Sequence, residues 1–402
     1  MKNVLVVAGV FLVVLIVFGC LYDTGHEGDG GIVPGVVPPD IEFEVTFIGE
    51  PENYCYGDNL VAADGALHYA GYRKIEVDEY DTDYMLTYGS WTSEGWKRED
   101  VIEHEWDIRR MAIRLDSAGR PMIVYQLAER YYGDPIQLHL AVKEGDEWTD
   151  ELILSFDYLG DFDFELDAQG QVHIAVIYYT QEESRLKYVT GQPGAWNIED
   201  VYGIDDSNNG VDLALDGDTT HILFLYTNWI GHDDDSTDEN KVVYAVRSGG
   251  TAWSTNVIRE ADETGLFPFL AIGGDGKAVT IFSEEDDVEY PGWKLIYATG
   301  GITGWTGQVY DSGVVYSGVT AFQAQDMIHV VYGKREYGAG VDNIYYGNDS
   351  GGSMAVTQVG DLETGGIVAA GTDSQNRVVV YHYLDDYRFE QPGVYRMVIT
   401  LH

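Results

Sequence analysis

Residues 111 to 148 contain the repeat that decides the fold. They begin Met111-Ala-Ile-Arg-Leu-Asp-Ser-Ala-Gly-Arg-Pro-Met-Ile-Val-Tyr125, continue through Leu138-His-Leu-Ala-Val142, and end at Gly145-Asp-Glu-Trp148. The apolar runs are short, and turns rich in Asp and Gly separate them. Runs of this length between such turns predict β-strands rather than helices.

The same unit recurs along the chain. Its turns begin 48 to 59 residues apart, at Asp64, Asp116, Asp167, Asp216, Asp275, Gln325 and Asp373. The residue before each fourth strand is also repeated, as Trp96, Trp148, Trp196, Trp253 and Trp305, with Met354 in the sixth unit. Seven units of about fifty residues with four strands each predict a seven-bladed, all-β propeller.

The seventh unit supplies only three strands before the chain stops, at residues 367–371, 377–383 and 394–401. The segment Glu42-Phe-Glu-Val-Thr-Phe-Ile48 stands where a fourth strand precedes every other unit. We therefore expect an N-terminal strand at about residues 42–48 to complete the last blade and close the ring. Closure would cover two strand edges that otherwise promote aggregation.

The N-terminus predicts export. An apolar run from Val4 to Phe18 follows Lys2 and leads to Gly19-Cys20. About fifteen residues is shorter than the roughly twenty that cross a membrane as a helix. Residues 1–20 are therefore interpreted as a lipoprotein-type signal peptide with lipidation at Cys20, and an uncleaved anchor is the alternative.

The Gly- and Pro-rich residues 21–41 are expected to form a flexible tether, and residues 42–402 a single propeller domain. The expected protein is extracytoplasmic and lipid-anchored to the cell membrane or outer membrane. Its lipid would be its only contact with the membrane.

The composition is strongly acidic, with 68 Asp and Glu against 23 Lys and Arg and a net charge of -45. This balance repels nucleic acid, so no nucleic-acid partner is expected. Acidity of this kind either keeps a surface hydrated in high salt, as in halophilic proteins, or collects divalent cations. Because the acidic residues are spread along the whole chain, we favour the first interpretation.

One acidic segment is a candidate cation site. Asp233, Asp235, Asp238 and Glu239 lie together after the second strand of the fourth unit. Carboxylate oxygens in this number suit Ca²⁺, which is the only cofactor that the sequence suggests. A solvated insertion is the alternative.

Loops between the second and third strands differ most between units and are both acidic and aromatic. Ligands usually bind at such variable loops on a repeated scaffold, and we expect them to share one face with the connections at residues 156–163 and 204–210. Aromatic rings stack on sugars, and carboxylates accept hydrogen bonds from hydroxyl groups. The candidate ligand-binding residues are Asp157, Tyr158, Trp229, Tyr290 and Tyr387.

Two polar residue types repeat with the units. His68, His173, His221 and His329 begin second strands, and an Asp precedes most of the Gly turns. Four imidazoles could bind a metal, but a residue that recurs in blade after blade usually makes the same structural contact in each. The repeated Asp is expected to accept backbone hydrogen bonds within its turn.

The units resemble those of secreted bacterial and archaeal lipoprotein β-propellers with sialidase-like, BNR-type repeats, over about residues 42–402. This resemblance implies the architecture. No unit carries the Ser-x-Asp-x-Gly-x-x-Trp turn, and of the three arginines that a sialidase needs, only Arg109-Arg110 stands near a candidate loop. The resemblance therefore does not imply an activity.

Two functions follow as hypotheses. The first is a cell-surface binding or scaffolding module for a glycan or an envelope protein, which would use loops on one face. The alternative is an extracytoplasmic glycoside hydrolase or sialidase-like enzyme that acts on polysaccharide. Because no catalytic motif is present in the sequence, we favour binding.

Overall fold

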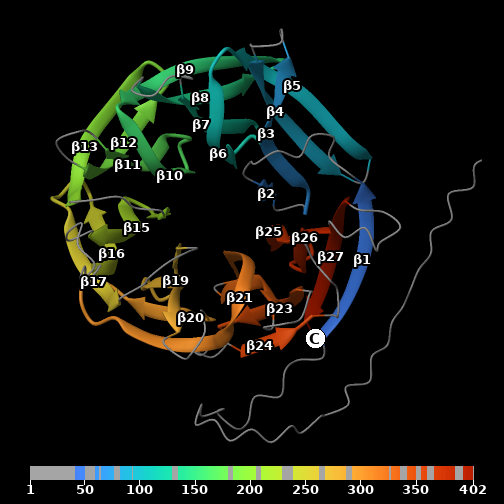
Figure 1. Cartoon of the computed structure of the whole chain (residues 1–402), viewed down its shortest axis with the longest axis vertical. Helices are drawn as coiled ribbons and strands as arrows, with labels where there is room; N and C mark the ends of the chain where they lie inside the picture. The colour runs from blue at the N-terminus through green and yellow to red at the C-terminus, as the bar shows by residue number, and fades with distance from the viewer. Residues whose placement is uncertain are drawn as a thin grey trace, which may run out of the picture.

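The structure is a computed structural model. It describes residues 41–49, 59–62, 65–76, 82–92, 94–128, 135–179, 184–204, 210–228, 239–261, 268–286, 292–325, 327–335, 342–349, 355–359, 366–384 and 393–401. Within these ranges, 27 strands form seven four-stranded blades around a central opening (Figure 1). The predicted seven-bladed propeller is confirmed.

The first four blades follow the chain, from the inner strand to the outer strand. Blade 1 comprises β2 (Asn59–Val61), β3 (Leu67–Glu76), β4 (Thr82–Thr92) and β5 (Gly95–His104). Blade 2 comprises β6 (Asp107–Leu115), β7 (Pro121–Ala128), β8 (Ile136–Glu144) and β9 (Glu147–Phe156). Blade 3 comprises β10 (Tyr158–Leu166), β11 (Val172–Tyr179), β12 (Ser184–Gln192) and β13 (Ala195–Ile204). Blade 4 comprises β14 (Val211–Asp216), β15 (Thr219–Asn228), β16 (Glu239–Ser248) and β17 (Ser254–Ala261).

The next two blades share one long strand, β21 (Thr306–Ala324). Its first half pairs with β20 as the outer strand of blade 5, and its second half pairs with β22 as the inner strand of blade 6. Blade 5 also contains β18 (Phe269–Ile272), β19 (Ala278–Asp286) and β20 (Gly292–Gly300). Blade 6 also contains β22 (Met327–Arg335), β23 (Asp342–Asn348) and β24 (Ala355–Gln358).

Blade 7 closes the ring as the sequence predicts. It joins β25 (Gly366–Thr372), β26 (Val378–Leu384) and β27 (Gly393–Leu401) to β1 (Ile41–Gly49). β1 runs antiparallel to β27, with Phe47 opposite Tyr395 and a ring separation of 5.0 Å. Val45 packs against the core between blades 6 and 7, while Thr46 is exposed. The predicted closing strand, residues 42–48, is extended by one residue at each end.

The core lies between the blades, because each sheet is buried on both faces. In β11, Val172, Ile174 and Val176 pack toward blade 2, and Ala175 and Ile177 pack toward blade 4. Successive side chains of a strand point to opposite faces, so a doubly covered strand reads as a continuous apolar run. In the described part of the chain, no helix is long and apolar enough to span a membrane.

The repeated histidines make the repeated contact that was predicted. In each case Nδ1 shares a hydrogen bond with a tyrosine hydroxyl on the third strand of the same blade. The distances are 2.7 Å for His68 and Tyr88, 2.6 Å for His221 and Tyr244, and 2.8 Å for His329 and Tyr346, and His173 and Tyr188 are joined in the same way. These histidines hold the third strand to the second.

The same tyrosines contact the next blade through its tryptophan. Ring separations are 5.6 Å for Tyr88 and Trp148, 5.2 Å for Tyr188 and Trp253, and 5.1 Å for Tyr244 and Trp305. Edge-to-face and tilted aromatic pairs of this kind add to the free energy of burial. The His–Tyr–Trp series therefore links strands within a blade and blades to each other.

The turn aspartates of blades 2, 3 and 7 also behave as predicted. Asp116 Oδ1 accepts backbone hydrogen bonds from Ala118 and Arg120, both at 2.9 Å. Asp167 and Asp373 accept the equivalent pairs in their own turns. The glycine in these turns has positive φ, and in blade 7 its place is taken by Asn376 with φ of 58°.

One predicted connection is wrong. Residues 156–163 were expected to form a loop, but Phe156 ends β9, Asp157 is a single bend residue and Tyr158 begins β10. Phe162 and Phe164 alternate with acidic residues and are buried. Alternation of this kind satisfies the strand period despite the charged residues.

Candidate ligand-binding site

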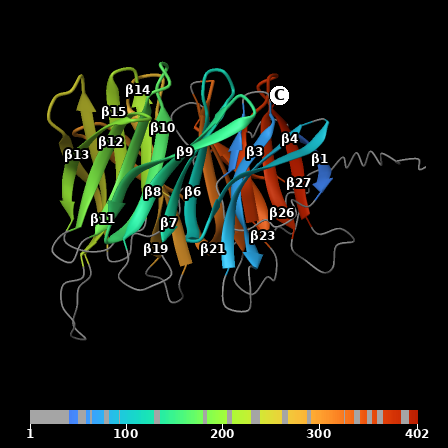
Figure 2. The same ribbon diagram turned by 90° about the horizontal axis from the view of Figure 1, so that it is seen from above.

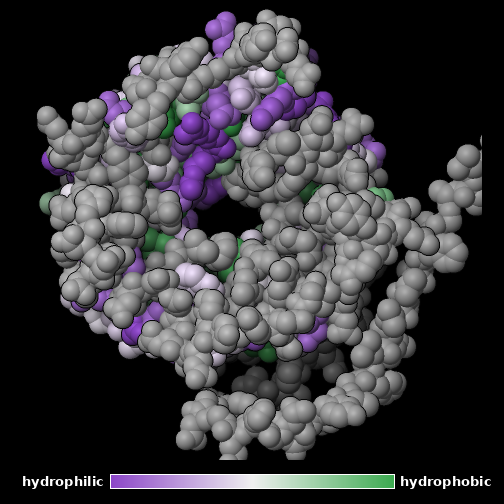
Figure 3. Space-filling view, viewed as in Figure 1, coloured by the Kyte–Doolittle hydropathy of each residue, from purple (hydrophilic) through white to green (hydrophobic). Residues whose placement is uncertain are grey.

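The opening through the ring is the natural place for a site. Figure 3 shows the hollow at the centre, with hydrophilic residues at its rim on the side that β6 and β10 occupy in Figure 1. The turn face of the ring carries the turns between first and second strands, such as the β14–β15 hairpin at the upper edge of Figure 2. The loop face is the opposite one.

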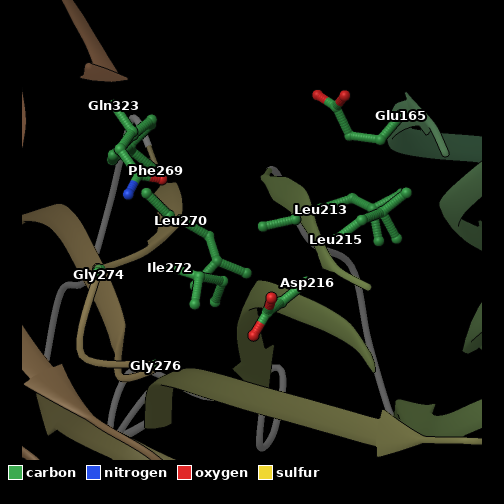
Figure 4. A pocket seen from close by; sticks show the side chains of 13 residues that line it. Glu165, Leu213, Leu215, Asp216, Phe269, Leu270, Ile272, Gly274, Gly276 and Gln323 are labelled. Atoms are coloured by element: carbon green, nitrogen blue, oxygen red, sulfur yellow. The ribbon is translucent and has the colours of Figure 1, made fainter. Parts of the chain in front are cut away.

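A cavity of about 500 Å³ lies at the turn face, where the inner strands of blades 3 to 6 end. Its polar side chains are Glu165 from β10, Asp216 from β14 and Gln323 from β21 (Figure 4). Phe269, Ile272, Leu213 and Leu215 contribute apolar surface, and the turn at residues 273–276 contributes backbone. No basic residue is among the described residues that line this cavity.

The accessible groups of the cavity are mostly acceptors. Asp216 and Gln323 are exposed, and the Glu165 side chain is 33% exposed. In Figure 4, Glu165 and Gln323 lie on opposite sides of the space. Two carboxylates and an amide beside apolar side chains can hold a ligand that has hydroxyl or ammonium donors and apolar C–H faces.

Glu165 is positioned by an arginine from the neighbouring blade. Arg114 of β6 donates from Nε to Glu165 at 2.8 Å and from Nη2 to Asp163 at 2.9 Å. Arg114 is 20% exposed and Asp163 13% exposed, so the pairs are largely shielded from water. This network joins blades 2 and 3 and fixes the position of Glu165 in the cavity wall.

Aspartates continue the network from one inner strand to the next. Asp163 accepts a hydrogen bond from the backbone N–H of Leu213 at 3.0 Å, and Asp212 accepts one from that of Leu270 at 2.6 Å. The carboxyl groups of Asp163 and Asp212 are also hydrogen-bonded to each other. The inner strands of blades 3, 4 and 5 are thereby tied together beside the cavity.

Burial controls the protonation of these acids. Loss of solvation raises the pKa of Asp163 well above its usual value, although Arg114 opposes this effect. Burial likewise raises the pKa of Asp212 to about 6, and it raises the pKa of Glu165. Two hydrogen-bonded carboxyl groups favour sharing one proton, which is the state expected in weakly acidic solution.

The structure places few of the predicted site residues. Asp157 is exposed and Tyr158 half-buried at the loop-face end of β10, the end opposite Glu165. Glu239 is the first residue of β16, opposite Asn228, and its side chain is outside the described part. Trp229, Tyr290, Tyr387, Asp233, Asp235, Asp238 and Cys20 lie outside the described residues.

Other predicted chemistry can be checked directly. Among the described residues, no group of three or more His, Cys, Asp or Glu side chains is arranged to hold a metal ion. Arg109 pairs with Asp107 at 3.7 Å and Arg110 pairs with Asp161. Both arginines are therefore engaged in ion pairs on blades 2 and 3.

Sequence reasoning did not single out Arg114, Glu165 or Asp212, although one signal was present. These charged residues lie inside short inner strands, where most units have small or apolar residues. Arg114 and Glu165 stand two residues before their turn aspartates, as does Ala214 in blade 4. Comparison of equivalent inner-strand positions could have identified them, because most units carry a small or apolar residue where these units carry a charged one.

One comparison with known proteins supports the architecture. No family model matches the chain, and no curated protein matches it. Among solved structures it is similar to polysaccharide lyase Uly1, with a TM-score of 0.56 and 10% identity over 87% of this chain and 91% of that chain. It is also similar to the β-propeller domain of the Trilobed protease from Pyrococcus furiosus, with a TM-score of 0.48 and 12% identity over 82% of this chain and 92% of that chain. The likeness to Uly1 supports the β-propeller fold that the strand pairing shows.

Proposed function

We propose that this propeller is a binding module for a glycan, and that the turn-face cavity holds a neutral or amino-bearing sugar unit. The observation that carries this proposal is the lining of the cavity. It combines Glu165, Asp216 and Gln323 with apolar side chains, and none of its described residues is basic. Catalysis is not part of the proposal, because Glu165 is held by Arg114 and the two buried aspartates bind backbone N–H groups.

The chemistry of a pyranose fits this lining. Its hydroxyl groups can donate to the carboxylates and accept from the Gln323 amide, and its C–H face can pack against Phe269 or Ile272. An ammonium group on an amino sugar would gain a charge-assisted hydrogen bond to Asp216 or Glu165. A volume of about 500 Å³ is within the range of small-ligand sites.

Charge selects against acidic glycans. The chain carries a net charge of -45, and two carboxylates face the cavity itself. A uronate or sulfate group would therefore be repelled at long range, and it would meet no cation among the described residues of the cavity wall. The proposed ligand class is a neutral or cationic glycan.

The proposed cellular setting follows from the N-terminus. With Cys20 lipidated, the tether over residues 21–41 would hold the ring outside the membrane, within reach of surface glycans. An envelope protein that carries such a glycan would be an equally accessible partner. This setting does not affect the chemistry of the cavity.

Titration calorimetry with neutral, amino-bearing and uronate-bearing oligosaccharides tests the proposal. Asp216→Asn and Gln323→Ala should each weaken binding about 5- to 10-fold, as expected for loss of one hydrogen bond. Asp218→Asn is the matched control, since Asp218 is in the same turn but does not line the cavity. Preference for the uronate ligand, or equal binding by Asp216→Asn, would refute the cavity assignment. Release of new sugar ends would instead assign hydrolase or lyase activity.

A further inference from the structure

The outer edges of neighbouring blades are joined by a repeated polar contact. Trp148 donates its Nε1–H to Glu99 at 3.2 Å, and Trp196 donates to Glu151 at 2.8 Å. In each pair the glutamate belongs to the outer strand of the preceding blade. Glu99, Glu151 and Glu199 occupy one register position, opposite Tyr88, Leu140 and Tyr188.

The junction between blades 4 and 5 lacks this carboxylate. The register position opposite Tyr244 is held by Asn256 instead of a glutamate. Trp305 still packs against Tyr244, but its Nε1–H is buried and has no acceptor among the described residues. Buried N–H groups are nearly always hydrogen-bonded, so an acceptor is missing at this junction. The Nε1–H of Trp253 also has no acceptor among the described residues, although Glu199 holds the register position on the preceding blade. Of these junctions, only that of blades 4 and 5 therefore lacks both the acceptor and the glutamate of this register.

A basic residue is missing there as well. Lys143 and Arg247 stand three residues after Leu140 and Tyr244, and each forms an ion pair with the glutamate of the preceding blade. The matching residue of blade 5 is Gly300. A Cβ atom at Gly300 would lie 2.6 Å from the Trp305 ring, so this glycine allows the indole to lie against the backbone.

A groove lies beside this junction on the flank of the ring, and Trp305 lines it, whereas Asn256 and Gly300 do not. Its volume is about 250 Å³, and its apolar surface comes from Phe282, Ile296, Ile258 and Trp305. Arg259 and Gln308 supply the polar groups of the lining. Arg259 binds Glu284 through two hydrogen bonds of 2.7 and 2.9 Å, yet half of its side chain remains exposed.

We propose that this groove binds a small amphiphilic carboxylate, which is a compact apolar body with one carboxylate group. The ligand carboxylate would enter the groove beside Trp305 and accept its Nε1–H, as Glu99 and Glu151 do for Trp148 and Trp196, after a small movement of the indole exposes this buried donor. The apolar body would lie against Phe282 and Ile296. Arg259 has five N–H donors, so it can donate two hydrogen bonds to Glu284 and still donate to the carboxylate of the ligand.

The salt dependence of this binding is unusual. The net charge of -45 repels an anion at long range, whereas the contacts in the groove are short-range and partly buried. Salt screens the first effect more than the second. Affinity for the carboxylate should therefore rise with salt concentration, and the titration is best made in molar salt.

The test uses the whole protein with ¹⁵N-labelled tryptophan and phenylacetate as the probe. The Trp305 indole signal, assigned with Trp305→Phe, should shift saturably at millimolar phenylacetate, and the signals of Trp148 and Trp196 should not. Benzyl alcohol, which lacks the carboxylate, should bind at least 10-fold more weakly. No saturable shift, an equal shift at all three indoles, or equal binding of benzyl alcohol would overturn the proposal.

A variant that restores the missing carboxylate provides the second arm. Asn256→Glu should move the Trp305 signal without any probe and weaken phenylacetate binding at least 10-fold. Asn197→Glu, an exposed position on the outer strand of blade 3, is the matched control and should bind like the wild type. Arg259→Gln, which removes the positive charge and leaves the apolar lining of the groove unchanged, should weaken binding several-fold. Unchanged binding in both Asn256→Glu and Arg259→Gln would contradict the site.

Discussion

The shell and the channel wall of this ring are built on different principles. The shell consists of the contacts among second, third and fourth strands of neighbouring blades, where His–Tyr pairs recur in four blades. The channel wall consists of the inner strands of the blades, and equivalent positions of β6, β10 and β14 hold Arg114, Glu165 and Ala214. Repetition indicates a contact that every blade needs, whereas variation on the same scaffold indicates recognition.

The two regions also differ in how they respond to pH. Burial lowers the pKa of the shell histidines His173, His221 and His329, so the folded state disfavours their protonation. Their contribution to stability is complete above pH 6.5 and is lost as the pH falls. Burial raises the pKa of Asp163 and Asp212 in the channel wall, so their contribution is present at low pH and is lost as the pH rises.

The largest expected effect comes from opening the shell. Removal of residues 41–49 takes away the strand that pairs with β27 from Leu401 to Val394. It exposes a strand edge and uncovers the core that Val45 contacts, so cooperative unfolding should be lost or aggregation should follow. Calorimetry of the truncated protein checks this. Removal of residues 23–38 is the control, and identical melting of both truncated proteins would contradict ring closure by β1.

Asp212→Asn should reduce the pH dependence of folding stability that comes from the buried carboxyl groups of the channel wall. The pKa of Asp212 is about 6 in the folded state and near its ordinary value of about 4 in the unfolded state. Through this residue the protein should lose up to about 3 kcal/mol of stability between pH 4 and pH 7. Asparagine does not titrate. Its single carbonyl oxygen cannot replace both carboxylate oxygens, which accept from the N–H groups of Leu213 at 2.9 Å and Leu270 at 2.6 Å, so stability will also be lower overall. Urea unfolding at the two pH values measures the difference. A slope equal to that of the wild type would rule out this role for Asp212.

His382→Leu should reduce the loss of folding stability that the protein shows as the pH falls below 7. His382 of β26 is fully buried, and neither ring nitrogen is hydrogen-bonded to a described residue. Burial lowers its pKa to about 4, so the wild type should lose about 2 kcal/mol through this residue between pH 7 and pH 5. Leucine removes that loss. Equal acid sensitivity of the variant and the wild type, measured by urea unfolding, would disprove this assignment.

Tyr244→Phe is the smallest change and isolates one shell contact. The hydroxyl is the partner of His221 Nδ1, while the ring still packs against Trp305. Leaving a buried imidazole nitrogen without a partner should cost about 1 to 3 kcal/mol. Thermal or urea unfolding checks the value against Tyr84→Phe, a half-buried tyrosine outside the His–Tyr series. Equal stability of the two variants would mean that the repeated hydrogen bond contributes nothing.

The repeated contacts could be predicted from sequence, whereas the pairing of charged residues in the channel wall could not. Asp116, His173 and Trp148 recur at fixed places in a local pattern, and each repeat confirms the others. Arg114 and Asp163 are 49 residues apart and meet only because neighbouring blades bring their inner strands together. Nothing within one unit reveals that partner. The loop residues from Trp229 to Glu239 remain a prediction, since none of their side chains is among those described.

The most direct test asks whether the channel wall binds the ligand while the shell provides stability. It combines isothermal titration with the best-bound oligosaccharide and melting curves. Asp216→Asn should weaken binding about 5-fold or more and leave the melting temperature unchanged, because Asp216 is exposed and lines the cavity. Tyr244→Phe should lower the melting temperature and leave the affinity unchanged. Loss of affinity in both variants, or wild-type affinity in Asp216→Asn, would contradict the central claim. That claim is that the cavity at the end of the channel binds the ligand, whereas the shell contributes stability alone.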